Sequence, residues 1–221
     1  MNAKDAPQTI DFARLRRDYK QRSLSEHEVD ADPVKQFIGW LHEAVDAGAM
    51  EPNAMTLATA TTDGLPSARI VLLKRMDHEG FSFFTNYRSP KARDLDANPR
   101  AALLFYWPEL ERQVRIEGTI SRTSEDESDA YFNNRPADAR VGSAASVQSE
   151  VLASREVLER AAADLRARYP HGNVPRPAHW GGYRLRPTRV EFWQGRPSRL
   201  HDRIEYVIDA SGSWMTRRLS P

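Results

Sequence analysis

The sequence predicts a mainly β protein with flanking helices, in which short antiparallel strands form a small barrel. About five short runs with an apolar period of two follow one another between residues 55 and 122. Tight-turn residues such as Asp63 and Gly64 separate these runs. Strand-like stretches return near the C-terminus, which indicates that the end of the chain completes the same sheet rather than forming a second domain.

Composition limits the chemistry that this chain can perform. With 221 residues, 40% of them hydrophobic, the chain can build one domain with a true core. Its 32 basic and 31 acidic residues give a net charge of +1, so no overall field favours nucleic acid or an anionic membrane. The absence of cysteine excludes disulfides and thiol chemistry, so redox activity would need a bound cofactor. No apolar stretch is long enough for a signal peptide or membrane span, and we expect a soluble, cytoplasmic protein.

The N-terminal region divides into an arm and a helix. Residues 1–32 are polar and lack periodicity, so we expect a mobile arm followed by a single domain over 33–221. The segment "DPVKQFIGWLHEAVDAG" predicts a helix, with Asp32 as its cap and Pro33 in its first turn. A stripe on this helix should face the core: Phe37, Trp40, Leu41 and Val45.

The middle of the chain supplies the barrel strands. "MTLATATT" and "SARIVLLKRM" predict a hairpin, and "GFSFFTN" predicts the next strand. "SPKARDLDANP" predicts a short helix that ends at Asn98 and Pro99. "RAALLFYW" and "RQVRIEGTISR" complete this run of strands.

The last third of the chain begins with helices and returns to strands. Helices are predicted in "SEDESDAYFNN" and, more strongly, in "SREVLERAAADLRARY". A proline-rich loop over 170–177 follows. "GGYRLRPTRVEFWQG" and "RIEYVIDASGSWMTRRL" predict strands over about 181–221 that complete the sheet.

Several familiar catalytic motifs are missing from the sequence. It contains neither G-x-G-x-x-G nor G-x-x-x-x-G-K-[ST], which argues against Rossmann and P-loop enzymes. The six histidines lack metal-ligand spacing, so no metal site is predicted, and there is no G-x-S-x-G elbow.

What remains is a set of basic and aromatic residues near strand ends. In "EFWQGRPSRLHDR", Arg199, His201 and Arg203 alternate, and an extended segment would place all three on one face. Such a face is either solvated or directed at an anion. Arginine, lysine and hydroxyl groups recognise phosphate, and aromatic or guanidinium planes recognise a flat ring.

Six motifs in a fixed order carry a resemblance to a known family: "RIVLLK", "FTN", "LERQVRIEG", "YFNNRP", "WGGYR" and "EFWQGRPSRLHDR". Through them the chain resembles the pyridoxine (pyridoxamine) 5′-phosphate oxidases over nearly its whole length. The resemblance implies an FMN-binding split β-barrel, antiparallel and Greek-key-like, that acts as a homodimer with FMN at the interface. It also implies oxidation of pyridoxine or pyridoxamine 5′-phosphate to pyridoxal 5′-phosphate, with O2 as acceptor and H2O2 released.

The same resemblance implies site residues. Those that would contact FMN are Arg69, Ile70, Val71, Leu72, Leu73, Lys74, Phe84, Thr85, Lys91, Gln113, Gln148, Ser149, Trp193 and Arg203. Those that would contact the substrate are Lys74, Tyr131, Arg135, Arg199, Leu200, His201 and, in the N-terminal arm, Arg16, Arg17, Asp18 and Tyr19. Arg199 and His201 would be the catalytic pair, with Arg199 lying over the substrate ring. Strict alternation along one strand would put Arg69 and Lys74 on opposite faces, unless a bulge intervenes.

Three positions depart from the family pattern. Pro90 stands where the family usually has arginine, Ala139 where it has a serine for the substrate phosphate, and Ala144 where it has tryptophan. We expect weaker binding from these changes rather than a lost activity. The alternatives are an FMN oxidase of another flat anionic ring, as in phenazine biosynthesis, and a non-catalytic binder of flavin, pyridoxal phosphate or haem.

Overall fold

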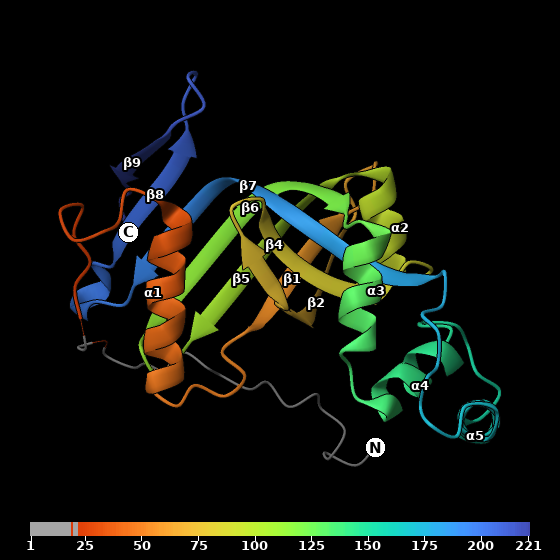
Figure 1. Cartoon of the computed structure of the whole chain (residues 1–221). Helices are drawn as coiled ribbons and strands as arrows, with labels where there is room; N and C mark the ends of the chain where they lie inside the picture. The colour runs from red at the N-terminus through yellow and green to blue at the C-terminus, as the bar shows by residue number, and fades with distance from the viewer. Residues whose placement is uncertain (1–18, 20–21) are drawn as a thin grey trace, which may run out of the picture.

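A single antiparallel sheet forms the body of the molecule (Figure 1). The structure is a computed structural model that describes residue 19 and residues 22–221. Within these residues the strands are β1 Ala54–Ala60, β2 Pro66–Leu72, β3 Arg75–Asp77, β4 Gly80–Asn86, β5 Arg100–Trp107, β6 Arg112–Arg122, β7 Trp180–Gln194, β8 Asp202–Ile208 and β9 Trp214–Arg218. The strand order is β2-β1-β5-β6-β7-β4-β3, and β8 pairs with both β7 and β9. The predicted mainly β, antiparallel architecture is therefore confirmed.

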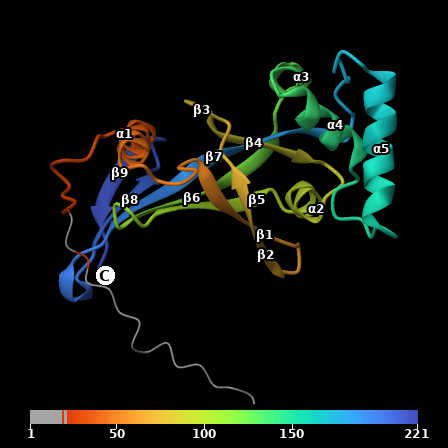
Figure 2. The ribbon, with the colours of Figure 1, turned by 90° about the horizontal axis from the view of Figure 1, so that it is seen from below.

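The helices gather at the two ends of the sheet. They are α1 Pro33–Asp46, α2 Pro90–Ala97, α3 Glu125–Asn133, α4 Ala137–Ala145 and α5 Arg155–Arg168, with a 3-10 turn at Pro197–Arg199. Figures 1 and 2 show α1 beside β8 and β9 at one end, and α3, α4 and α5 at the other. None of the helices in the described part of the chain is long and apolar enough to cross a membrane.

Helix α1 forms because its first turn is capped and one of its faces is apolar. The Asp32 carboxylate accepts the Val34 backbone N–H at 2.8 Å. Phe37 and Trp40 are buried as predicted. The predicted core residue Val45, however, is 54% exposed, and Ala44 is buried in its place.

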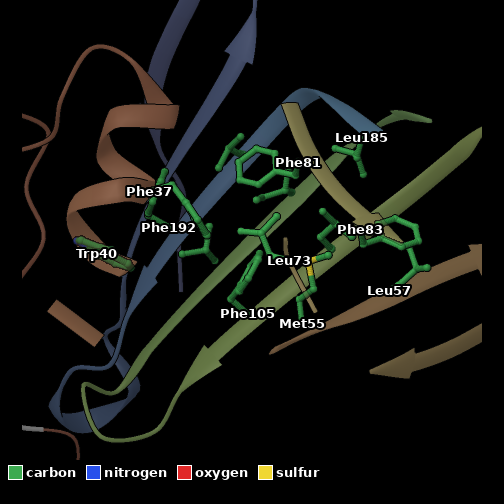
Figure 3. Close-up of a cluster of buried hydrophobic side chains, with 14 of the residues drawn as sticks. Phe37, Trp40, Met55, Leu57, Leu73, Phe81, Phe83, Phe105, Leu185 and Phe192 are labelled. Carbon is green, nitrogen blue, oxygen red and sulfur yellow. The ribbon is translucent and has the colours of Figure 1, made fainter. Parts of the chain in front are cut away.

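Aromatic side chains fill the core between α1 and the sheet (Figure 3). The ring of Phe37 lies edge-on to Phe105 with ring centroids 4.8 Å apart, and to Phe81 at 5.1 Å. Trp40 contacts Phe192 of β7 in the same way. These edge-to-face contacts fix α1 on the half of β7 that pairs with β8.

Strand β7 is the longest strand of the sheet, at 15 residues. It pairs with β6 from Tyr183 to Gln194, with β4 through its first half and with β8 through its second half. The register with β6 shifts between Glu117 and Gly118, close to Pro187. A Cβ atom at Gly118 would lie 2.0 Å from the Arg186 carbonyl oxygen, so only glycine fits this bulge.

Two local predictions fail for identifiable reasons. The stretch "SARIVLLKRM" is not one strand, because the chain leaves β2 after Leu72 and the Lys74 backbone N–H donates to the Ser82 carbonyl of β4. Strict alternation between Arg69 and Lys74 therefore does not apply. Helix α4 was not predicted, since only Val141 on it is buried and the segment has no apolar stripe.

The chain before α1 lies against the C-terminal strands. Leu24 is buried, and Arg218 donates to its carbonyl oxygen at 3.0 Å. The Tyr206 hydroxyl donates to the Asp30 carbonyl at 2.7 Å. Residues 22–32 of the predicted arm thus pack against β8 and β9, and the remainder of the arm, apart from Tyr19, lies outside the described residues.

The bulge at Gly118 gives a stability prediction with an internal control. Gly118→Ala should lower the free energy of unfolding by about 2–3 kcal/mol, because the added methyl group meets backbone atoms. Gly39→Ala, in α1 with open space around its Cβ, should raise it by about 0.5–1 kcal/mol. Urea unfolding of both variants checks this, and an unchanged midpoint for Gly118→Ala would contradict the assigned role.

Candidate functional site

A cavity of about 540 Å³ opens between β2, β4, α3 and α4. Its wall combines aliphatic, aromatic, hydroxyl and cationic side chains. The lining residues are Ile70, Val71, Leu72, Lys74, Phe84, Thr85, Asn86, Lys91, Tyr131, Arg135, Ala139, Gly142, Ser143, Ser146, Gln148 and Trp180. Such a mixture suits a ligand with a flat ring and an anionic group.

Three of the lining residues are cations without a carboxylate partner. Among the described residues, no Asp or Glu forms an ion pair with Lys74, Lys91 or Arg135. Lys91 and Arg135 are half-buried. Because partly desolvated cations are costly to leave unpaired, their arrangement around one cavity indicates that an anion binds there.

Lys91 lies at the start of α2, within reach of three oxygen atoms. Its Nζ lies 2.9 Å from Gln148 Oε1 and 3.2 Å from the hydroxyls of Thr85 and Ser89. Burial, with a smaller effect from the nearby Arg69 guanidinium, lowers the pKa of Lys91 to about 8. A bound anion would stabilise the charged form and raise this pKa again.

Arg69 supports the cavity from outside its wall. Its Nη1 donates to the Thr59 hydroxyl at 2.8 Å and to the Leu57 carbonyl at 3.2 Å. These bonds tie the guanidinium to β1 rather than to the cavity. Arg69 therefore acts on Lys91 through its charge.

Arg135 lies on the opposite side of the cavity, at the start of the loop into α4. Its guanidinium carbon lies 4.8 Å from the centre of the Trp180 ring, and its Nη1 donates to Ser143 Oγ at 2.6 Å. Burial lowers its pKa from the ordinary value, although arginine stays charged at any physiological pH. The ring and the hydroxyl hold the guanidinium at the edge of the cavity.

Three aromatic rings form a stacked wall beside these cations. Phe84 and Tyr131 have centroids 4.0 Å apart with planes inclined by 16°, and Phe84 and Trp180 are 5.5 Å apart at 12°. Burial raises the pKa of the Tyr131 hydroxyl, so the group stays protonated. A stacked wall of this kind suits a flat heteroaromatic ligand.

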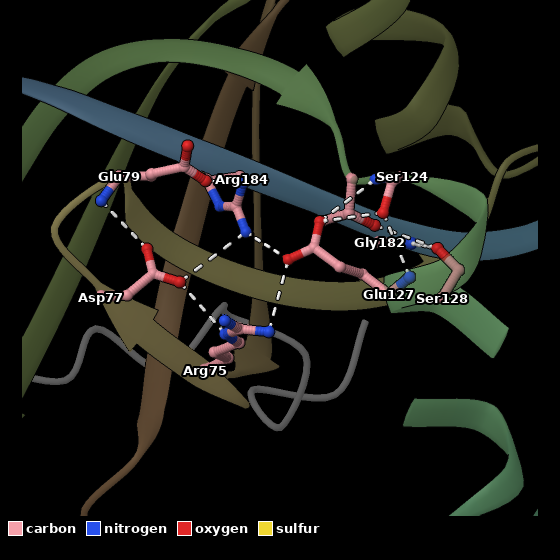
Figure 4. Close-up of polar contacts among 9 residues, drawn as sticks. Arg75, Asp77, Glu79, Ser124, Glu127, Ser128, Gly182 and Arg184 are labelled. Atoms are coloured by element: carbon pink, nitrogen blue, oxygen red, sulfur yellow. Dashed lines mark hydrogen bonds and ion pairs between the residues drawn. The ribbon is translucent and has the colours of Figure 1, made fainter. Parts of the chain in front are cut away.

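Ion pairs and hydrogen bonds link α3, the helix that carries Tyr131, to the neighbouring strands (Figure 4). Glu127 closes a capping box with Ser124 at the start of α3 and also binds Arg184 of β7. Arg184 binds Glu79 as well, and Arg75 pairs with Glu127 at 3.4 Å. Glu127 thereby ties the helix to β3 through Arg75 and to β7 through Arg184.

A second group of predicted residues lies at the other end of β7. Gln113, Trp193 and Arg203 are directly opposite one another on β6, β7 and β8. Arg203 donates to the buried Glu191 carboxylate from Nε at 2.7 Å and from Nη2 at 3.1 Å. These contacts raise the pKa of Arg203 and fix its guanidinium beside Trp193.

His201 belongs to this second group. Its ring lies 4.6 Å from Trp193 and 5.7 Å from Tyr19 between centroids. Its Nδ1 accepts the Arg196 backbone N–H at 3.1 Å, so the neutral ring carries its proton on Nε2. Burial, followed by the charge of Arg199, lowers the pKa of His201. At neutral pH this histidine is therefore a hydrogen-bond donor through Nε2.

The prediction that Arg199, His201 and Arg203 lie on one face of an extended segment is wrong. Residues 197–199 form a 3-10 turn, with φ of +56° at Ser198 and +63° at Arg199, and β8 begins only at Asp202. Arg199 and Leu200 therefore project from an exposed turn rather than from a strand. Ser198 and Arg199 adopt a left-handed conformation, which no alternation pattern could indicate.

The two groups of residues are far apart within one chain. Trp180 lines the cavity at the start of β7 and Trp193 lies near its end, about 40 Å away along the strand. None of Gln113, Trp193, Arg199, His201 or Arg203 lines the cavity. Figure 1 shows the corresponding ends of β7 beside α3 and beside α1.

The structure thus sorts the predicted residues into distinct locations. The cavity contains Ile70, Val71, Leu72, Lys74, Phe84, Thr85, Lys91, Tyr131, Arg135 and Gln148. Leu73 points into the hydrophobic core, and Ser149 follows Gln148 with φ of +72°. Arg16, Arg17 and Asp18 lie outside the described residues.

Sequence reasoning missed part of the cavity wall. The residues not predicted are Asn86, Gly142, Ser143, Ser146 and Trp180. The motif "WGGYR" was available as a signal for Trp180. The stretch "GSAASVQS", which resembles the family pattern G-x-W-x-S-x-Q-S, was a signal for Gly142 and Ser146, whereas Ser143 occupies a variable position of that pattern.

The fold and the cavity define a class, the split-barrel proteins with a site for a flat anionic ligand. A solved pyridoxamine 5′-phosphate oxidase-related, FMN binding protein from Nostoc punctiforme shares this fold, with a TM-score of 0.67 over 83% of this chain and 96% of its own, at 18% identity. PhzG from Burkholderia lata, solved with tetrahydrophenazine-1-carboxylic acid, gives a TM-score of 0.84 at 36% identity over 88% of this chain and 95% of its own.

Family models and curated relatives identify the family within this class. The model for pyridoxamine 5′-phosphate oxidase matches residues 41–169, and that for the pyridoxine 5′-phosphate oxidase C-terminal dimerisation region matches residues 180–221. Pyridoxine/pyridoxamine 5′-phosphate oxidases from Cupriavidus pinatubonensis and Rubrobacter xylanophilus are 60% and 58% identical, over 95% and 96% of this chain and 99% and 97% of their own. The chain belongs to the pyridoxine/pyridoxamine 5′-phosphate oxidase family.

Proposed function

We propose that this protein is an FMN-dependent oxidase that converts pyridoxine 5′-phosphate and pyridoxamine 5′-phosphate to pyridoxal 5′-phosphate. The observation that carries the proposal is the cavity in which Lys74, Lys91 and Arg135 lack carboxylate partners beside a stacked aromatic wall. The 60% identity to a curated pyridoxine/pyridoxamine 5′-phosphate oxidase supports this substrate class. FMN and the substrate each have a flat ring and a phosphate, which is the combination that the cavity suits.

The site is shared between two copies of the chain. Within one chain, most of the length of β7 lies between the cavity and the pair Trp193 and His201. A complete site therefore requires a second copy of the chain, whose Trp193 and His201 lie beside the cavity of the first. The match of residues 180–221 to a dimerisation region supports an interface formed by this end of the chain. A two-fold dimer then has two equivalent composite sites.

Each cation has a separate role in this assembly. Lys91, with Thr85, Ser89 and Gln148 around it, holds the FMN phosphate at the start of α2. Arg135, with Lys74 and Tyr131, holds the substrate phosphate. Two phosphate subsites in one cavity place the two rings face to face.

The second copy supplies the groups that orient the reacting carbon. Bound FMN would supply a two-electron oxidation: the hydride from C4′ would go to the flavin and the proton of the alcohol or amine to solvent, O2 would reoxidise the flavin with formation of H2O2, and hydrolysis would release ammonia from the amine substrate. Arg199 covers the substrate ring and His201 donates its Nε2 hydrogen to the substrate. Gln113 and Arg203, the latter fixed by Glu191, contact the flavin.

The decisive experiment mixes the purified holoprotein with pyridoxine 5′-phosphate without oxygen. We expect the flavin absorbance near its visible maximum to bleach and to return when O2 is admitted, with H2O2 and pyridoxal 5′-phosphate formed in equal amounts. The 36% identity to PhzG keeps a reduced phenazine-type ring as the second candidate. Bleaching by that ring alone would support the second candidate, and a haem spectrum or a flavin that no substrate bleaches would contradict both.

The pKa of Lys91 gives a pH prediction for FMN binding. This pKa is lowered to about 8 in the free protein, so the ammonium loses its proton as the pH rises through that value. Only the charged form attracts the FMN phosphate, which is already a dianion at pH 7. The dissociation constant of FMN should therefore rise about tenfold between pH 7 and pH 9. Lys91→Arg, which keeps its charge, should show no such rise in a fluorescence titration, and a parental rise in that variant would contradict the assignment.

Complementation between two variants tests the shared site. Arg135→Leu removes a cation from the cavity and Arg199→Met removes one from the other end of β7, so each homodimer should be nearly inactive. In a randomly mixed population half of the dimers are heterodimers, and each heterodimer has one intact site. We expect the mixture to recover about a quarter of the parental specific activity. A site built within one chain would give no recovery, since every chain in the mixture would be damaged.

A further inference from the structure

We propose that Ser143 of α4 is a direct ligand of the substrate phosphate and the residue that orients Arg135 toward it. This inference rests on the proposed function, since it concerns the phosphate subsite of the same cavity. Neither the sequence motifs nor the comparisons assign a role to this serine.

Ser143 reaches the cavity because of its position on α4. Ala139 and Ser143 are four residues apart, so they lie on the same face of the helix, and both line the cavity. Val141, between them in sequence, is buried on another face. The face toward the cavity therefore has a methyl group at Ala139 and a hydroxyl group one turn later.

The hydrogen-bonding state of Ser143 leaves its hydrogen available. A serine within a helix commonly donates to the carbonyl oxygen four residues earlier, which here would be that of Ala139. In the described part of the chain, the hydrogen bond of Ser143 is instead the one that Oγ accepts from Arg135 Nη1, at 2.6 Å. Because Oγ acts as the acceptor there, its own hydrogen is available for an acceptor in the cavity.

Arg135 and Ser143 together fit a phosphate. The guanidinium has no carboxylate partner among the described residues and lies over the Trp180 ring, so its remaining N–H groups are free to point into the cavity. A phosphate monoester has three terminal oxygens that can accept from a guanidinium and from a neighbouring hydroxyl at the same time. The Arg135–Ser143 bond brings these two donors to adjacent positions.

The test measures phosphate recognition separately from flavin binding. In Ser143→Ala, the dissociation constant of pyridoxal 5′-phosphate from the oxidised holoprotein should rise about tenfold, while that of pyridoxal, which lacks the phosphate, should not change. The KM for pyridoxine 5′-phosphate should rise by a similar factor with kcat within about threefold of the parent. The dissociation constant of FMN should stay at its parental value.

A rescue variant and a control complete the design. Ala139→Ser in the Ser143→Ala background places a hydroxyl one turn earlier on the same helix face, and we expect it to restore most of the lost affinity for pyridoxal 5′-phosphate. Ser154→Ala, which removes an exposed serine before α5 and outside the cavity wall, should match the parent in every measurement.

Two outcomes would overturn the proposal. Unchanged affinity for pyridoxal 5′-phosphate in Ser143→Ala would show that the hydroxyl does not contact the phosphate. An equal loss for pyridoxal and its phosphate would show a general distortion of the cavity. A failure of the proposed function is distinguishable, because the parental protein would then bind pyridoxal 5′-phosphate no better than pyridoxal.

Discussion

The arrangement of the molecule depends on backbone pairing along one strand, β7. From Tyr183 to its end the strand pairs with β6, and on its other edge it pairs first with β4 and then with β8. The register shift opposite Gly118 leaves Thr188 of β7 without a partner on β6, and a bulge of this kind bends the strand on which it lies. One half of β7 thereby anchors the cavity through Trp180, and the other presents Trp193 at the opposite end of the sheet. The separation of the two groups of residues within one chain is a direct result of this pairing.

Charge is distributed differently at the two ends. At the Trp193 end the buried carboxylates Glu191 and Glu205 are each paired with two arginines. In the cavity, Lys91 and Arg135 are held only by neutral oxygens. The two ends therefore differ in that buried carboxylates bind arginines at the Trp193 end, whereas no carboxylate of the described residues pairs with the cavity cations Lys91 and Arg135. Since unpaired, half-buried cations cost stability, the difference is best explained by anions that bind in the cavity.

Sequence patterns predicted what depends on local periodicity and could not predict what depends on distant pairing. The capped start of α1 and the β1–β2 hairpin follow from residues close in sequence, and both are present. The break before Lys74 depends on a hydrogen bond to Ser82, and the turn at Arg199 depends on positive φ angles, neither of which leaves a periodic signal. The resemblance to the family predicted most of the residues that line the cavity. They could not show that the named residues fall into two groups at opposite ends of one strand.

The departures from the family pattern lie where the local structure tolerates them. Pro90 is the first residue of α2, a position whose backbone N–H has no partner within a helix, so proline leaves the helix and the adjacent Lys91 in place. Ala139 removes a hydroxyl from α4, but the next residue on that face, Ser143, already contacts Arg135. A helix face presents a new side chain to the cavity at each turn, so a donor lost at one turn can be supplied at the next. Recognition of an anion therefore requires a hydrogen-bond donor on this face of the helix, but it does not require that donor at one particular position.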